Sequence, residues 1–367
     1  MKILQITHYG NTTNYGAVLQ AYALQRALEK QGHEPILLRA SFSFNNIMRH
    51  WYRNPGRFLR ACVKQLDDCF EERRHPRKFS EFIQKNLNCS AGVYHSHRAL
   101  LKGNLHADAL VTGSDQVWSS KKIFPPYFLD FANADAKRFS YAASVGSIAR
   151  MDESYLSSFR KAVSGFDAIS VREFEGLEQC RRAGVANAEL VLDPVFLLTP
   201  EEYVKLLALS PLRSKPYCLL YTVGKRKPPC MDELAEYCRQ KDLDFLIVSS
   251  SGRRMKFPKT AIKIYPEIPD FVCLIKNASL VATDSFHGAA FSILFNRKFV
   301  YFSKNSHDAR FETLDRLFGA GRALYKGDLR ECLKSDIDYG KINSAISVMR
   351  NEGYDFISGA LCGKRGK

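Results

Sequence analysis

Residues 279–288 combine an apolar segment with side chains that can bind an anion and transfer a proton. The apolar residues 279–283 predict a strand, and Asp284-Ser285-Phe286-His287-Gly288 follow it directly, before a helical pattern. A histidine titrates near neutral pH, and the N–H groups of a helix's first turn attract phosphates and carboxylates. We therefore expect residues 284–288 to bind an anionic ligand, with His287 as an acid–base group. The simpler alternative is a histidine that only caps or packs locally.

A second polar segment follows the strand predicted at 109–112 and contains Ser114, Asp115 and Trp118. Asp115 is suited to positioning or deprotonating a sugar hydroxyl, and the Trp118 ring is suited to stacking on the face of a sugar. An aspartate that caps the next element beside a core tryptophan explains the same residues. Both interpretations stay open at this point.

A third polar segment, residues 8–16, lies between a strand predicted at 2–7 and a helix predicted from 17 to 30. It ends in Asn14-Tyr15-Gly16, close to the free N–H groups of the helix. Neither G-x-G-x-x-G nor the P-loop spacing occurs in the chain, so dinucleotide and Walker-type binding lack their usual support. Asn14 and Gly16 either contact a ligand or only cap the helix and form the turn.

Cationic side chains near strand ends are candidates to bind an anion. Arg172 follows a strand predicted at 168–171, and Lys304 and Arg310 follow one predicted at 298–302. Surface ion pairing is the alternative for each. Small residues at 140–147 also end a predicted strand, where they permit a ligand to approach closely.

Two α/β series would position these segments. Residues 2–38 predict a strand, a helix and a second strand, and further strands are predicted at 109–112, 139–143, 168–171 and 189–192. After a proline-containing stretch at 199–216, a second series runs from a strand at 217–223 to one at 298–302. Strands that alternate with helices predict parallel sheets covered by helices on both faces. We expect domains at 1–198 and 199–328, then a helical segment with a basic tail at 329–367. Ligands of open α/β sheets bind at the carboxyl ends of the strands, so we expect a cleft between the domains.

The composition of the chain limits the charge of its binding partner and the cellular compartment in which it is expected. Lys and Arg outnumber Asp and Glu by 54 to 38, and the net charge of +16 favours an anionic partner. The ten cysteines form no C-x-x-C and no Cys/His set has zinc-ligand spacing, so we expect no metal. The first residues become polar too soon for a signal peptide, and no run approaches the roughly 18 apolar residues of a membrane span. The cytoplasm is the expected compartment.

Residues 49–78 carry an unusual density of basic side chains. Arg53, Arg57, Arg60 and Lys64 recur beside an apolar stripe, which predicts a basic amphipathic helix after Pro55. Such a helix can lie on an anionic membrane surface. A solvated face whose stripe packs on the first domain is the simpler alternative.

Five segments together resemble the polysaccharide pyruvyl transferase family, in its order. They are residues 14–22, 113–118, 140–144, 170–173 and 285–288, and the resemblance spans residues 1 to about 325. It implies two Rossmann-like halves similar to the GT-B glycosyltransferases. It also implies transfer of a carboxyethylidene group from phosphoenolpyruvate to two hydroxyls of one sugar, which gives a cyclic pyruvate ketal.

The resemblance also implies roles for particular residues. His287 matches the family histidine that contacts phosphoenolpyruvate, so residues 284–288 are expected to bind the donor. The residues expected to bind the acceptor are Asn14, Tyr15, Gly16, Ser114, Asp115 and Trp118. Better-known members have an arginine two residues before that histidine, where this chain has Ser285. Arg172, Lys304 or Arg310 would then supply the missing charge. General acid–base groups suffice for the reaction, so neither a metal nor a cofactor is expected.

Two other functions remain as alternatives. A nucleotide-sugar glycosyltransferase of the same architecture would bind a nucleotide at the helix ends of the second domain. A basic nucleic-acid-binding protein would rest on the net charge alone, and the sequence contains no recognisable nucleic-acid motif. We therefore expect a transferase that acts on a cell-surface polysaccharide or its lipid-linked precursor, with peripheral contact to the inner membrane face and no nucleic acid.

Overall fold

The computed structural model describes residues 1–9, 13–40, 42, 76–119, 122–146, 152–224, 226–250, 256–303, 308–334 and 337–363. The chain divides into two compact units, each built from separate stretches of sequence. Unit 1 consists of Met1–Thr12, Gln20–Leu197 and Asn351–Lys367, and unit 2 consists of Thr13–Leu19 and Leu198–Arg350. The basic segment that contains Arg53, Arg57, Arg60 and Lys64 lies outside the described residues.

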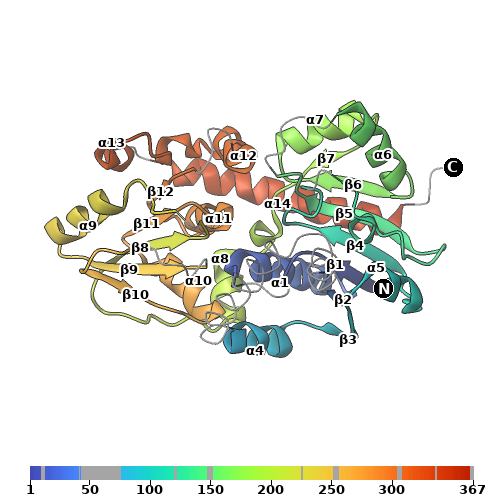
Figure 1. Cartoon of the computed structure of the whole chain (residues 1–367), viewed down its shortest axis with the longest axis horizontal. Helices are drawn as coiled ribbons and strands as arrows, with labels where there is room; N and C mark the ends of the chain where they lie inside the picture. Colours follow the sequence, from blue (N-terminus) through green and yellow to red (C-terminus); the bar gives the residue numbers. More distant parts are fainter. Residues whose placement is uncertain are drawn as a thin grey trace, which may run out of the picture. The chain divides into compact units, whose positions relative to one another are not determined.

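Unit 1 contains a seven-stranded parallel sheet (Figure 1). Its strand order is β3-β2-β1-β4-β5-β6-β7. The chain therefore moves outward from β1 to β3 and then returns to the other side of β1 with β4. In sheets of this kind the strand order reverses between two neighbours, and ligands bind beyond the carboxyl ends of those two strands. In unit 1 these strands are β1 and β4. The strands are β1 (Lys2–Ile6), β2 (Glu34–Ala40), β3 (Cys89–Tyr94), β4 (Ala109–Gly113), β5 (Lys137–Ala143), β6 (Ala168–Val171) and β7 (Glu189–Leu190).

Apolar helix faces cover this sheet. Leu24 and Leu28 of α1 pack with Ile3 and Val111, and the end of α14 contributes Phe356 to the same core. A second cluster joins β5 and β6 to α6 and α7 around buried aromatic rings. The helices that contribute to unit 1 are α1 (Tyr15–Lys30), α4 (Pro76–Asn86), α5 (His97–Lys102), α6 (Glu153–Val163), α7 (Phe174–Arg182) and the end of α14 (Tyr339–Cys362), with the short 3-10 helices η1 (Pro125–Phe128) and η2 (Pro194–Phe196).

Unit 2 contains a five-stranded parallel sheet in the order β10-β9-β8-β11-β12, so its strand order reverses between β8 and β11. Helix α9 contributes Met231 and Leu234 to the core on one face, and Phe271 of α10 packs on Tyr221 of β8. The strands are β8 (Tyr217–Thr222), β9 (Asp244–Ser249), β10 (Ala261–Lys263), β11 (Leu280–Thr283) and β12 (Phe299–Tyr301). The helices are α8 (Pro200–Leu206), α9 (Met231–Gln240), α10 (Ile268–Asn277), α11 (Phe286–Leu294), α12 (Ala309–Phe318) and α13 (Leu329–Lys334), with η3 (Ala320–Ala323).

The fold class expected from the sequence is confirmed, because both units are α/β with parallel sheets. The domain bounds differ in two places. Residues 13–19, at the start of α1, belong to unit 2, and the C-terminal stretch 329–367 divides between the units at Arg350. Among the described residues, no helix has both the length and the apolar character needed to cross a bilayer.

Candidate functional site

Asp284 connects the two strands between which the order of unit 2 reverses. It follows β11, and its Oδ1 accepts a hydrogen bond from the Val223 N–H at 2.7 Å. Its Oδ2 accepts from the Gly224 N–H at 3.0 Å and from Thr222 Oγ1 at 2.9 Å. The carboxylate therefore holds the loop that leaves β8. A direct contact between Asp284 and a donor stays a prediction.

His287 lies in the first turn of α11, whose N-cap is Ser285. The Ser285 hydroxyl accepts a hydrogen bond from the Gly288 N–H at 3.4 Å, so this serine ends the strand segment and starts the helix. Gly288 is required because a Cβ there would lie 2.3 Å from Thr283 Oγ1. The His287 side chain is buried, and its ring packs edge-on to Phe286 with 5.2 Å between the ring centroids.

The N-terminus of α1 meets His287 within unit 2. A Cβ built on Gly16 would lie 2.2 Å from His287 Nδ1, so only a glycine permits this approach. Asn14 Oδ1 accepts hydrogen bonds from the Gly16 N–H at 3.1 Å and from the Tyr221 hydroxyl at 3.3 Å. Two helix N-termini thus converge on one histidine, and both carry the partial positive charge that favours an anion. Asn14 and Gly16, which were predicted for the acceptor site, therefore lie with His287 in unit 2.

Tyr221 is a polar member of this site that sequence reasoning missed. Because Tyr221 lies within an apolar strand, the sequence pattern predicts only that its side chain packs in the core. Burial raises the pKa of its hydroxyl, and hydrogen bonds to Ser250 and Ser285 oppose that shift. The hydroxyl therefore stays protonated and can donate a hydrogen bond.

The side chain of Tyr15 is packed in the protein core, which corrects the expectation that it contacts an acceptor. Its side chain is 1% exposed, its ring stacks on Phe271 at 4.1 Å, and its hydroxyl donates to the Pro266 carbonyl at 2.7 Å. A ring held on all these sides offers no face to a ligand. Tyr15 instead fixes the first turn of α1 on α10.

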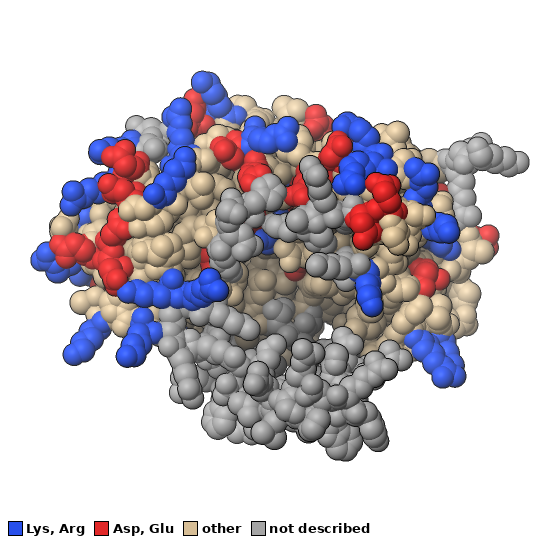
Figure 2. Space-filling view, turned by 45° about the horizontal axis from the view of Figure 1, so that its top comes forward, with Lys and Arg blue, Asp and Glu red and all other residues tan. Residues whose placement is uncertain are grey.

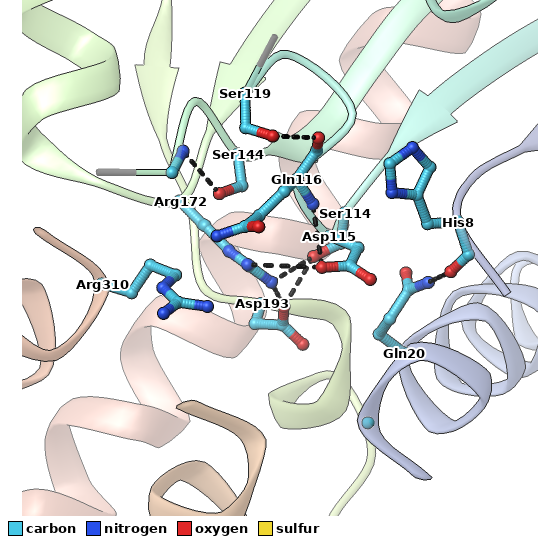
Figure 3. A network of polar contacts seen from close by, with 12 residues as sticks. His8, Gln20, Ser114, Asp115, Gln116, Ser119, Ser144, Arg172, Asp193 and Arg310 are labelled. Carbon is cyan, nitrogen blue, oxygen red and sulfur yellow. Dashed lines mark hydrogen bonds and ion pairs between the residues drawn. The ribbon is translucent and has the colours of Figure 1, made fainter. Parts of the chain in front are cut away.

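Arg172 forms the centre of a buried polar network in unit 1 (Figure 3). Its Nη1 donates to Asp193 Oδ2 at 2.6 Å and to Ser114 Oγ at 3.1 Å, and its Nε donates to Glu173 Oε1 at 3.1 Å. Asp115 Oδ1 lies 4.0 Å from Nη2. Burial lowers the pKa of Arg172, but the charges of Asp193, Glu173 and Asp115 outweigh that effect and raise it.

This network corrects the expectation that Arg172 binds the anionic donor. One guanidinium faces three carboxylates, so the cluster has no excess positive charge with which to attract a phosphate. Glu173 lies in one of the segments that resemble the family, but neither Glu173 nor Asp193 was predicted to be a site residue. The only signal was their place at predicted strand ends, where polar residues are common.

Trp118 belongs to the core of unit 1, which corrects the expectation that its ring stacks on a sugar. The side chain is 1% exposed and stacks on Phe128 with 5.4 Å between the ring centroids. Its Nε1 donates to the Tyr127 carbonyl at 3.1 Å. The structural alternative noted for this tryptophan is therefore the correct one.

Asp115 stands at the carboxyl end of β4 with an unusual backbone conformation. Its φ is +51°, in the left-handed region that aspartate tolerates better than most residues. Its carbonyl accepts hydrogen bonds from the N–H groups of Val117 and Ser144, and its Oδ1 accepts from the Gln116 N–H. Ser114, beside it, donates to Asp193 Oδ2 at 2.5 Å. The side chain of Asp115 is therefore fixed at the edge of the sheet, next to the network of Arg172.

Arg310 pairs with Asp308, the N-cap residue of its own helix α12. Its Nε and Nη2 donate to the two carboxylate oxygens of Asp308, each at 3.0 Å, and Asp308 also accepts from the Tyr301 hydroxyl at 2.7 Å. This pairing offsets the charge of Arg310, so a contact with the donor would require the guanidinium to share it. Lys304, the other expected cation, lies outside the described residues.

Solved structures of other proteins share the fold of this chain. UDP-GlcNAc 2-epimerase from Methanocaldococcus jannaschii has a TM-score of 0.53 and 14% identity, over 100% of this chain and 94% of its own. UDP-GlcNAc 2-epimerase from Neisseria meningitidis, bound to UDP-GlcNAc, has a TM-score of 0.53 and 9% identity, over 98% and 99%. UGT89C1 from Arabidopsis thaliana, complexed with UDP-L-rhamnose, has a TM-score of 0.53 and 11% identity, over 99% of both chains. These similarities confirm the GT-B-like fold and show the fold alone.

The family comparison is more specific. A search of curated proteins found no significant match. The model of one family, described as polysaccharide pyruvyl transferase, matches residues 14–306. This span includes Asp115, the network of Arg172 and the two helix N-termini that meet at His287. Because the match covers well over half of the sequence, the chain belongs to the polysaccharide pyruvyl transferase family.

Proposed function

We propose that this protein transfers a pyruvyl group from phosphoenolpyruvate to two hydroxyls of one sugar and thereby forms a cyclic ketal. The observation that carries the proposal is the convergence of the N-termini of α1 and α11 on His287 within unit 2. Phosphoenolpyruvate carries a phosphate and a carboxylate, and helix N-termini favour both. Family membership supports the same assignment.

His287 is the proposed acid of the donor half. Ketal formation begins when the methylene carbon of phosphoenolpyruvate takes up a proton, which makes the neighbouring carbon electrophilic. A histidine can deliver such a proton near neutral pH. The partial positive charge of the two helix N-termini would hold the phosphate beside it, in place of the family arginine that Ser285 replaces. Arg310 and Lys304 stay proposed as additional cations.

The acceptor half is proposed for unit 1, beyond the carboxyl ends of β1 and β4. The side chain of Asp115 is 17% exposed there and offers a carboxylate to a sugar hydroxyl, with Arg172 Nη2 4.0 Å from its Oδ1. A sugar of a cell-surface polysaccharide or of its precursor fits the family. Lipid linkage of that precursor, a cytoplasmic location and contact with an anionic membrane through residues 53–64 are further parts of the proposal.

A nucleotide-sugar glycosyltransferase is the second candidate. The observation that favours it is the fold shared with proteins solved with UDP-GlcNAc or UDP-L-rhamnose. It predicts that UDP-sugars bind to unit 2 and that phosphoenolpyruvate does not. A nucleic-acid-binding function has less support, because Lys and Arg are interspersed with Asp and Glu over the described part of the face in Figure 2.

The test combines binding and turnover with the purified full-length chain. Phosphoenolpyruvate is titrated by calorimetry, and phosphate release and ketal formation are followed by NMR with free, nucleotide-linked and lipid-linked sugars. We expect phosphate release to depend on a sugar that has two suitably placed hydroxyls. Binding of UDP-sugars without any binding of phosphoenolpyruvate would favour the glycosyltransferase instead.

His287→Gln should lower the rate of transfer by about 100-fold or more, which is the usual contribution of a positioned acid–base group. The matched control is His106→Gln, because His106 is exposed and precedes β4 at the amino-terminal edge of the unit 1 sheet. A rate for His287→Gln within about threefold of the wild-type rate would remove His287 from the mechanism.

A further inference from the structure

His8 and Asp115 lie beyond the two strands between which the order of unit 1 reverses. Strands β1 and β4 are parallel neighbours, with Ile6 opposite Thr112. His8 follows the end of β1, and Asp115 follows the end of β4. The carboxyl ends of two such strands are where open α/β sheets bind ligands. Figure 3 shows both side chains at this edge.

The backbone of His8 is held, while its imidazole is accessible. Gln20 Nε2 donates to the His8 carbonyl at 3.3 Å and to Thr7 Oγ1 at 3.1 Å, which fixes the chain just beyond β1. The ring packs against that of Tyr127 with 4.7 Å between centroids. The side chain is exposed, and within the described residues neither ring nitrogen has a hydrogen-bond partner. A ligand can therefore reach the ring.

The charges around His8 favour a neutral ring that can be protonated when needed. The surrounding protein atoms lower its pKa below the ordinary 6.5 by displacing water, and the charge of Asp115 acts in the opposite direction. Tyr127, from η1, stays protonated because burial and the charge of Asp115 both raise its pKa. Arg172, from the end of β6, faces Asp115 at 4.0 Å. At pH 7 the imidazole is thus mainly unprotonated, with a carboxylate near enough to stabilise its cation.

We propose that His8 is the catalytic base of the acceptor site and that Asp115 is its positioning residue, a role that rests on the proposed pyruvyl transfer. The accessible imidazole takes the proton of a sugar hydroxyl, and the fixed carboxylate stabilises the imidazolium that forms. This assignment changes the part of Asp115. Its charge stabilises the protonated base, and it does not take the proton itself.

The proton balance of the reaction is consistent with this role. As the hydroxyl oxygen bonds to the central carbon of phosphoenolpyruvate, the carbon–carbon π bond breaks and its electron pair takes a proton at the methylene carbon. The hydroxyl proton passes to His8. The carbon–oxygen bond to phosphate then breaks, the second hydroxyl adds to the same carbon, and its proton leaves with the phosphate. The proton on His8 returns through solvent to the group that protonated the methylene carbon.

The test uses His8→Gln in the full chain, with His106→Gln as the matched control. We expect His8→Gln to lower kcat for ketal formation by about 100-fold or more. We expect its affinity for phosphoenolpyruvate to stay within about twofold of wild type, because the proposed donor site lies in unit 2. His287→Gln should instead slow the protonation of phosphoenolpyruvate, which is the step proposed for His287.

Asp115→Asn supplies a readout that a purely structural role would not move. Asparagine keeps the acceptor oxygen for the Gln116 N–H but removes the charge that raises the pKa of His8. A base acts only above its pKa, so the wild-type rate should rise with pH through a value below 6.5. In Asp115→Asn this limb should move to lower pH, and kcat at pH 7 should fall because the imidazolium is less stabilised.

Three outcomes decide the matter. A large loss in His8→Gln with unchanged donor affinity supports the proposal. If the wild type forms the ketal and His8→Gln retains its rate, or if the acidic limb stays in place in Asp115→Asn, the role of His8 is wrong and the proposed function stands. If the wild type neither binds phosphoenolpyruvate nor releases phosphate with any acceptor, the proposed function fails, and this role fails with it.

Discussion

Gly16 shows how one absent side chain sets the geometry of the proposed donor site. An alanine is usually better than a glycine in a helix, by about 1 kcal/mol. At position 16, however, a Cβ would overlap the His287 ring, with 2.2 Å to its Nδ1. Gly16→Ala should therefore displace His287 and lower the transfer rate at least about tenfold, and overpacking should cost about 1 to 3 kcal/mol of folding free energy.

Two comparisons isolate the cause of that effect. Gly359→Ala in α14 is the control, because Gly359 is exposed and nothing lies within 4 Å of its added Cβ, so this variant should be neutral or more stable. In a His287→Gly background, which removes the ring and also the Cβ that would lie 2.6 Å from the added Cβ, Gly16→Ala should destabilise the protein less. Thermal unfolding and transfer rates measure both. An equal cost of Gly16→Ala in the two backgrounds would contradict the explanation.

At the scale of elements, a β-bulge in β5 shapes the part of unit 1 that is proposed to bind the acceptor. The register between β5 and β6 shifts between Ser140 and Ala143, where Ala142 has a φ of +52°. Two buried hydroxyls replace the lost ladder bonds. Ser140 Oγ donates to the Ser170 carbonyl at 3.0 Å, and Ser170 Oγ donates to the Ser140 carbonyl at 2.9 Å and accepts from the Ala142 N–H at 3.1 Å.

Ser170→Ala should consequently destabilise unit 1 by about 1 to 3 kcal/mol, because it leaves a buried N–H and a buried carbonyl with fewer partners. Chemical denaturation measures the change. The control is Ser158→Ala, because Ser158 lies on the exposed face of α6 and its hydroxyl donates to the Ser154 carbonyl. Loss of this hydroxyl should cost less than about 0.5 kcal/mol. Equal stabilities of the two variants would show that the hydroxyl pair does not support the bulge.

At the scale of the whole molecule, the last helix completes the first unit. Residues Asn351–Lys367 belong to unit 1, and α14 places Phe356, Ile357 and Leu361 in its main core. Ile357 is fully buried. Each such side chain contributes about 1.5 to 3 kcal/mol on burial, so the three together approach the 5 to 15 kcal/mol by which a domain is typically stable.

We therefore expect that a chain truncated after Arg350 does not form a stable unit 1. Circular dichroism and solubility of the truncated chain measure this. Ile357→Ala gives a graded test and should cost about 2 to 5 kcal/mol. Val348→Ala is its control, since Val348 lies in the same helix but is 58% exposed. A truncated chain with the wild-type melting temperature would contradict this role of α14.

The amino-acid sequence is enough to predict the type of fold and the positions of the polar segments. Alternating strand and helix patterns predict parallel sheets because each element buries one face and must pack on the next. Polar side chains at strand ends stand out against apolar strands, so residues 113–118 and 284–288 could be identified without a structure. The family resemblance rested on the same local segments, and the family comparison confirms it.

The contacts of each of these side chains could not be predicted, because they depend on how the elements pack together. Trp118 and Tyr15 have types that suit a ligand, but packing places both rings in the core. Arg172 has the charge that an anion needs, but folding brings Asp193 from 21 residues away to within 2.6 Å of its Nη1. The approach of Gly16 to His287, across most of the chain, and that of His8 to Asp115 depend on strand order. The hydrophobic pattern of a sequence predicts whether a segment is a helix or a strand. It does not predict which elements lie beside it, because that depends on the packing of the whole core.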